Sequence, residues 1–150
     1  MGHNLRMTDI QGALGVLQVK KLEELTKQRI ANANYLTRHL QGSLQTPITL
    51  PGCRHVFHQY TVRIPKNRNV WIQQLSSRGI GTAIHYPTPI HQQPFYQEHP
   101  NLWRFGSSLS NGHLPMAEAA AREVLALPVH PALSENDLAT ITREVLQLCD

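Results

Sequence analysis

The sequence predicts a small α+β domain, in which a long N-terminal helix and later helices cover a sheet of two or three short strands. Apolar residues recur at helical spacing over residues 8–41 and 134–148, and an alternating run occupies residues 56–64. The connections between the expected strands are too short for several parallel crossovers. With 150 residues, 41% of them hydrophobic, the chain is long enough to bury one core of its own.

The first expected helix begins at Thr8 and ends near Gly42. Thr8 is a good N-cap residue, and glycine favours the end of a helix. After Lys20 and Lys21 the apolar stripe is narrow and predicts a surface helix, whereas the first turns are apolar on nearly all sides and should be buried against more than one neighbour. Because the helix starts within ten residues, we expect further protein before it. The apolar residues of these first turns are Ile10, Ala13, Leu14, Val16, Leu17 and Val19.

Prolines, glycines and capping residues divide the rest of the chain into short elements. The expected elements are a strand at 56–64, a helix from Asn69 to Gly79, a strand at 80–86, a proline-rich segment without regular structure at 87–100, a helix at 115–126, a possible short strand at 127–129 and a last helix from Ser134.

Composition argues against several classes of protein. The net charge is +4, but the 14 basic residues are scattered and no nucleic-acid-binding motif occurs, so an anionic partner is only weakly indicated and nucleic acid is not expected. Cys53 and Cys149 have no metal-ligand spacing and suit a reduced, cytoplasmic chain. The sequence shows no signal peptide and no apolar run long enough to span a membrane, so we expect no membrane association.

The nine histidines do not have the spacing of a metal site. His55 and His58 would point to opposite faces of a strand, no HExxH occurs, and a third ligand beside His85 and His91 is not evident. The serines lack a GxSxG context, and the glycines form neither GxGxxG nor a phosphate loop. We therefore expect no metal, no hydrolytic triad and no nucleotide loop of these kinds.

Two segments contain residues suited to ligand binding. Asn4 and Arg6 lie directly before the first helix, where unpaired N–H groups and a guanidinium would favour a phosphate; a capping asparagine and a solvated arginine explain them as well. The segment Gly79–His91 carries His85, Tyr86 and His91 into a proline-shaped loop. These three side chains would suit a ligand site, although core packing of the tyrosine and solvation of the histidines are the alternative.

Together these segments resemble the C-terminal region of the DegT/DnrJ/EryC1/StrS sugar aminotransferases, over essentially the whole chain. The order and spacing of four blocks support the resemblance. They are GHNLRMTDIQGALG at 2–15, HVFHQY at 55–60, GIGTAIHYPTPIH at 79–91, and LPMAE at 114–118 leading to LALPVHP at 125–131.

The resemblance implies the small C-terminal domain of a fold-type-I aminotransferase, with residues 1–41 forming the helix that joins it to a missing domain that holds pyridoxal phosphate on a lysine. It further implies active sites at a dimer interface. Asn4 would reach the cofactor phosphate of the neighbouring subunit, whereas Arg6, His85, Tyr86 and His91 would lie near a sugar or nucleotide-sugar substrate.

Two departures from the family pattern affect these expectations. His3 replaces a common aromatic residue such as tyrosine, and the family's cofactor-binding lysine would lie upstream of this sequence. Transamination needs a lysine amine that holds the cofactor and moves protons, and none of the four lysines lies in such a setting. These lysines are Lys20, Lys21, Lys27 and Lys66.

Three interpretations remain open. The first is a fragment of a pyridoxal-phosphate-dependent sugar aminotransferase that is inactive alone and associates as a homodimer or with a lysine-bearing N-terminal half. The second is a noncatalytic dimerisation or binding module that keeps the small-domain fold. The third and least favoured is a regulatory nucleic-acid binder, which would lose affinity steeply as salt is added.

Overall fold

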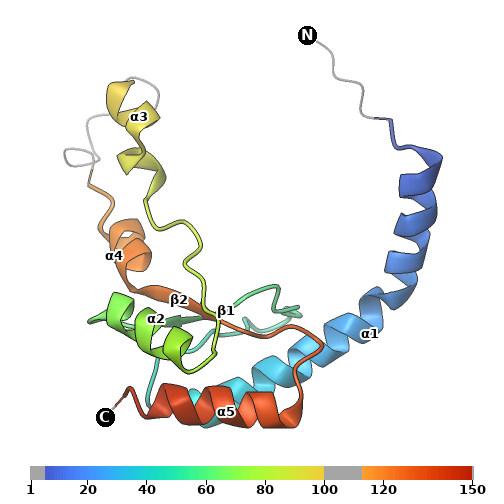
Figure 1. Cartoon of the computed structure of the whole chain (residues 1–150). Coiled ribbons are helices and arrows are strands. Elements are labelled where there is room, and N and C mark those ends of the chain that lie inside the picture. The colour runs from blue at the N-terminus through green and yellow to red at the C-terminus, as the bar shows by residue number, and fades with distance from the viewer. Residues whose placement is uncertain (1–5, 100–112, 150) are drawn as a thin grey trace.

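A computed structural model describes residues 6–99 and 113–149 and confirms the mixed class of helices with a small sheet (Figure 1). In chain order the elements are α1 (Asp9–Leu40), β1 (Tyr60–Arg63), α2 (Arg68–Ser77), the 3-10 turn η1 (Ile90–Gln92), α3 (Pro94–Glu98), α4 (Pro115–Glu123), β2 (Val124–Leu127) and α5 (Glu135–Leu146). No helix in these described segments is both long and apolar enough to cross a membrane.

The sheet consists of β1 and β2, paired antiparallel with Tyr60 opposite Leu127 and Arg63 opposite Val124. The segment expected as a strand at 80–86 meets this sheet at one residue only. Ala83 exchanges two backbone hydrogen bonds with Ala126, of 3.1 and 2.8 Å, and no further pair of that ladder forms. The prediction of a full strand was wrong because the segment turns away at both ends: the Ile80 N–H bonds back to α2, and a left-handed residue lies at position 86.

The strand expected at 56–64 is less than half as long as predicted, since β1 covers Tyr60–Arg63 only. Tyr60, Val62 and Ile64 point inward as the alternation indicates. Upstream of them, Phe57 has φ of 47° and donates its N–H to Nδ1 of His55 at 2.9 Å, so its backbone cannot continue the ladder. This turn also reverses the phase, since Phe57 is buried while Val56 is exposed.

The other boundaries differ for local physical reasons. α4 stops at Glu123 instead of 126 because Val124–Leu127 pair with β1, which outweighs helix propensity. α2 begins after Asn67 and not after Asn69. The proline-rich segment contains η1 and α3 although no regular structure was expected, since Pro94 occupies the first helical turn, where a missing N–H costs nothing.

The core lies between the inner face of the sheet and the helices α1, α2 and α5. Figure 1 shows α5 beside the later turns of α1, beneath the sheet. The side chains that are fully buried there come from all of these elements. They include Leu36 and Leu40 of α1, Tyr60 and Val62 of β1, Leu75 of α2, Leu125 of β2 and Val145 of α5.

Helix α1 begins and ends as the sequence predicts, but its first turns are not covered by the rest of the chain. Thr8 forms a capping box with Gln11, and the helix stops before Gly42, which takes the left-handed conformation at φ 98°. In Figure 1 the N-terminal turns project away from the body. The burial expected for them is absent, because no other described segment reaches Ile10, Leu14 or Val19.

Candidate functional site

An open groove of about 970 Å³ lies along the side of β2 that carries the Ala83 bridge. The segment Gly79–Ala83 forms one wall, and the residues that follow β2, with the start of α5, form the other. The polar side chains that line it come from five separate parts of the chain. They are Arg29, His58, Gln59, Arg78, Thr82, His85, His130, Asn136, Asp137 and Thr140.

Left-handed residues adjoin two of the three histidines that line this groove. Phe57, with φ of 47°, precedes His58, and Tyr86, with φ of 61°, follows His85. A bulky residue rarely adopts this conformation unless its surroundings hold it there, and such outliers cluster at functional sites. The Ala83–Ala126 bridge fixes the backbone two residues before His85, so the position of this imidazole depends on the sheet.

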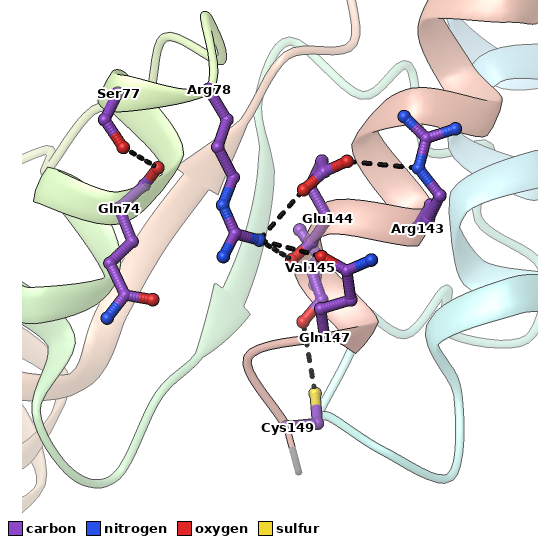
Figure 2. Close-up of polar contacts among 8 residues, drawn as sticks. All are labelled: Gln74, Ser77, Arg78, Arg143, Glu144, Val145, Gln147 and Cys149. Atoms are coloured by element: carbon purple, nitrogen blue, oxygen red, sulfur yellow. Dashed lines mark hydrogen bonds and ion pairs between the residues drawn. The ribbon is translucent and has the colours of Figure 1, made fainter.

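Arg78 fastens the start of the groove-forming segment to α5 (Figure 2). Its Nη1 donates to Glu144 Oε2 at 2.9 Å and to Gln147 Oε1 at 3.1 Å. Glu144 is further bonded by Arg143 Nε at 3.0 Å, and its side chain is only 15% exposed. Because Gly79 follows directly, this network sets where the backbone leaves α2 and enters the groove wall.

Helix α1 is joined to the opposite wall by one buried amide. Asn32 Nδ2 donates to the carbonyl oxygen of His130 at 2.9 Å, and Asn32 is only 8% exposed. One turn earlier, Arg29 donates from Nε to the carbonyl oxygen of Val56 at 3.4 Å and from Nη2 to Thr26 at 3.3 Å. These bonds hold the Arg29 guanidinium at the groove.

The groove contains more basic than acidic side chains, although Arg78 is already paired with Glu144. Two guanidinium groups, of Arg29 and Arg78, line it together with three imidazoles. The carboxylate of Asp137 is already occupied, since it accepts from Ser134 Oγ at 2.7 Å and from Ser134 N–H at 2.9 Å. The Ser134 hydroxyl, followed by its N–H group, lowers the pKa of Asp137 below the ordinary value of 3.8. The groove therefore suits a ligand that is anionic or rich in hydrogen-bonding oxygens.

His91 lies in a second cluster, packed on α4. Its Nε2 is 3.0 Å from Glu118 Oε1, and its side chain is 5% exposed. The same carboxylate oxygen accepts the Leu114 N–H at 3.0 Å, and His113 Nδ1 lies 3.5 Å from it. The Leu114 N–H lowers the pKa of Glu118 most, and the bond from His91 adds to this effect. Gln97 Nε2 also donates to the His91 carbonyl oxygen.

The residues expected at a substrate site do not all meet in this chain. His85 lines the groove, and Tyr86 adjoins it with a side chain that is 85% exposed. His91 is buried against α4 and does not line the groove. Arg6 is exposed and precedes the projecting first turn of α1, and Asn4 lies outside the described residues. Their roles toward a ligand stay predictions.

Sequence reasoning assigned no role to several residues of these two sites. Arg29 was placed within the expected surface helix and given no role, and His58 was considered only as a metal ligand. No local spacing relates either of them to His130. A signal did exist for Glu118, because an acidic residue in the first turn of a proline-initiated helix commonly bonds a free N–H group.

No cluster of three potential metal ligands occurs within residues 6–99 and 113–149. All four lysines of the sequence fall within these ranges and are exposed, and none lines the groove. The groove of this chain thus has no amine that could hold an aldehyde cofactor covalently, whereas its guanidinium and imidazole groups fit an anionic ligand.

Comparison with known proteins identifies the family. The chain is 34% identical to a "Pleiotropic regulatory protein" of Geobacillus stearothermophilus, over 98% of this chain and 38% of that protein. It is 34% identical to a dTDP-3-amino-3,4,6-trideoxy-alpha-D-glucose transaminase of Streptomyces venezuelae, over 88% of this chain and 33% of the relative. The crystal structure of S. venezuelae DesV superposes with a TM-score of 0.86 at 30% identity, covering 99% of this chain and 38% of DesV.

The chain thus spans less than two fifths of the length of these relatives. The sequence model of the family matches residues 1–146, which include the first turns of α1, both walls of the groove and the His91–Glu118 cluster. On this match the chain belongs to the DegT/DnrJ/EryC1/StrS aminotransferase family.

Proposed function

We propose that this chain is the small-domain part of a pyridoxal-phosphate-dependent aminotransferase that acts on a keto sugar. The chain would be inactive by itself because it lacks the cofactor-binding lysine. The family supports the reaction class, and relatives named as transaminases of dTDP-linked sugars support a nucleotide-linked substrate. A protein of this kind would work in the cytoplasm, where nucleotide sugars are made.

The separation of two groups of residues is the observation that carries this proposal. His85 and Tyr86 lie at the groove of the body, while Arg6 precedes the first turn of α1, which projects away from that body. One copy of the chain cannot bring both groups to one ligand in this conformation. In a homodimer, each active site could combine Arg6 of one subunit with His85 and Tyr86 of the other. A homodimer of the completed protein is therefore part of the proposal.

Each of these residues has a chemical role in the proposed site. The amide of Asn4 would donate to the cofactor phosphate of the neighbouring subunit, and the Arg6 guanidinium would offer paired donors to phosphate oxygens of the substrate. His85 and Tyr86 bind and orient the sugar or its nucleotide, and His91 holds the loop beside them. Pyridoxal phosphate, when bound, supplies the electron sink through which an amine is exchanged for a carbonyl.

The missing lysine explains why we expect no activity from the chain alone. Lys20, Lys21 and Lys27 are exposed on α1, and Lys66 is exposed after β1. A catalytic lysine must instead lie in a partly desolvated pocket beside the cofactor. The part of the relatives that this chain does not span would supply that residue.

The decisive experiment mixes the purified chain with a lysine-bearing N-terminal part of a family member. Amino transfer to a dTDP-linked keto sugar, with glutamate as donor, should appear in the mixture and in neither part alone. Asn4→Ala and Arg6→Ala should abolish most of it, whereas Asn34→Ala and Arg38→Ala, exposed controls on the same helix, should not. A stable, well-folded mixture that remains inactive would contradict the proposal, as would borohydride trapping of pyridoxal phosphate on one of the four lysines together with activity of the chain alone.

The exposed first turns of α1 favour a second candidate, a noncatalytic dimerisation module. Ile10 is 75% exposed and Val19 70%, and an apolar surface of this kind is usually covered in the working protein. Self-association would bury it without any lysine-bearing part. Sedimentation of the chain as a monomer at high concentration would exclude this candidate, and a tight dimer that takes up no N-terminal part would favour it.

A further inference from the structure

We propose that Glu118 is a positioning residue, which orients His91 and thereby fastens the loop at residues 87–99 beside Tyr86 and His85. The proposal deepens the proposed function, on which its relation to a sugar substrate rests. Its structural basis is the contact between His91 Nε2 and Glu118 Oε1, at 3.0 Å, which joins the loop to α4 across 27 residues of sequence.

Glu118 has more than a capping role. Its Oε1 accepts the Leu114 N–H at the start of α4, as a first-turn acid commonly does, and the same atom meets the imidazole of His91. Both side chains are withdrawn from solvent, at 11% and 5% exposure. A hydrogen bond to a charged group in such surroundings is stronger and more directional than one at the surface.

The contact also fixes the tautomer of His91. Because hydrogen bonds lower the pKa of Glu118, the carboxylate is ionised at neutral pH and can only accept. The imidazole must then carry a proton on Nε2. The ring orientation of His91 follows from this bond, and a single carboxylate selects one of the two tautomers.

Further hydrogen bonds connect the described residues of this loop to one another. Gln97 of α3 donates to the His91 carbonyl oxygen, so α3 and η1 are tied to the same residue. Gln93 Nε2 bonds within the loop, to the Thr88 carbonyl oxygen at 3.2 Å. Tyr86 itself is 85% exposed and has a left-handed backbone, so its direction is set by what holds the chain on either side of it. On one side this is the Ala83 bridge, and on the other it is His91.

The first test measures the contact directly in the chain as it exists. Long-range ¹⁵N NMR should show a proton on His91 Nε2 at neutral pH, and Glu118→Ala should remove the preference for that nitrogen. Amide exchange over residues 87–99 should rise about tenfold or more in Glu118→Ala, the effect expected of one charged hydrogen bond, while α5 remains protected. Glu118→Gln retains an acceptor oxygen for both bonds and should restore most of the protection.

Glu123→Gln is the matched control. Glu123 ends the same helix and pairs with Arg63 at 3.3 Å, with a side chain 25% exposed, but it does not contact His91. Its replacement should leave the tautomer and the exchange of residues 87–99 unchanged. An unchanged tautomer in a folded Glu118→Ala variant, or an equal rise in exchange in the Glu123→Gln variant, would overturn the proposal.

The second test asks what the contact does in the completed enzyme. In the mixture with a lysine-bearing part, Glu118→Ala should raise KM for the keto sugar about tenfold and change kcat much less, because misplaced binding groups weaken substrate binding. Glu118→Gln should lie near the wild type. Equal loss of kcat in both variants would refute a positioning role. If the wild-type mixture has no activity, the proposed function fails, whereas the NMR and exchange results still decide whether Glu118 positions His91.

Discussion

The two halves of α1 belong to one uninterrupted helix and yet have opposite surroundings. Ala33, Leu36 and Leu40 in the later half are completely buried, whereas Leu14 in the first half is 58% exposed. Both halves carry apolar residues at helical spacing, and only the later one meets α5 and the sheet (Figure 1). An apolar face on a helix therefore predicts that the face is buried in the working protein. Whether the same chain buries it depends on the rest of the fold.

The first consequence concerns stability, and it is the largest effect we expect. Leu36→Ala should lower the free energy of unfolding by about 3 kcal/mol, because it opens a cavity in a packed core. Leu14→Ala, the same change in the first half, should alter it by no more than about 0.5 kcal/mol. Urea unfolding of the isolated chain measures both. Similar losses for the two variants would mean that the first half of α1 is covered in solution, and sedimentation would then show whether a second copy covers it.

The attachment of the later half of α1 can be tested at Asn32. Its amide bond to the His130 carbonyl oxygen is the point where α1 joins the chain between β2 and α5. Asn32→Ala should cost about 1 to 2 kcal/mol, since a buried carbonyl loses its partner. Asn34→Ala, exposed on the same helix, should cost less than about 0.5 kcal/mol. Equal effects in urea unfolding would show that helix propensity, and not the bond, dominates at both positions.

Features that depend on neighbouring residues were predictable from sequence, and this applies to both helix starts. Thr8 and Ser134 form capping boxes with residues three positions later, a spacing visible in any sequence. Inward alternation from Tyr60 was equally readable. By contrast, the left-handed Phe57 that shortens β1 and the pairing that converts the end of the expected helix at 115–126 into β2 depend on distant partners. The conformational preferences of the local residues do not indicate either feature.

In the candidate site too, residues close together in sequence could be predicted, whereas contacts between distant segments could not. His85 and Tyr86 were found because they lie in one short segment whose prolines and aromatic residues indicate a shaped loop. Arg29, His58 and His130 line the same groove from three unrelated segments, and only the fold brings them together. His91 was expected beside a ligand, and the structure adds that its Nε2 is engaged by Glu118, a partner 27 residues away. That partner could not be chosen from several acidic residues by sequence alone.

A smaller effect distinguishes the two helix starts that the sequence predicted equally well. Ser134 Oγ accepts the Asp137 N–H at 3.1 Å, and Thr8 Oγ1 accepts the Gln11 N–H at 3.3 Å. Ser134→Ala should lower the free energy of unfolding by about 1 kcal/mol, because α5 belongs to the core. Thr8→Ala removes the same kind of cap from a half-helix that the core does not hold, so thermal unfolding should be unchanged. Faster amide exchange confined to the first turns of α1 would confirm the loss of the cap, whereas an equal loss of global stability would show that both halves unfold together.

The smallest expected effect is the pH dependence that the α5 cap contributes. The Ser134 hydroxyl and N–H hold the pKa of Asp137 below 3.8 in the folded chain, so the unfolded chain takes up this proton first as the pH falls. The stabilisation is therefore complete above about pH 5 and is lost progressively as the pH falls through 3.8 toward the lowered pKa. Asp137→Asn should reduce the slope of the free energy of unfolding against pH in this range, measured by urea unfolding. Part of the remaining slope comes from Glu118, whose pKa is lowered as well. Glu135→Gln removes a carboxylate from the same turn without touching the Ser134 bonds and should retain the wild-type slope. If Asp137→Asn retained it too, the Ser134 bonds would not lower the pKa of Asp137 in the folded chain.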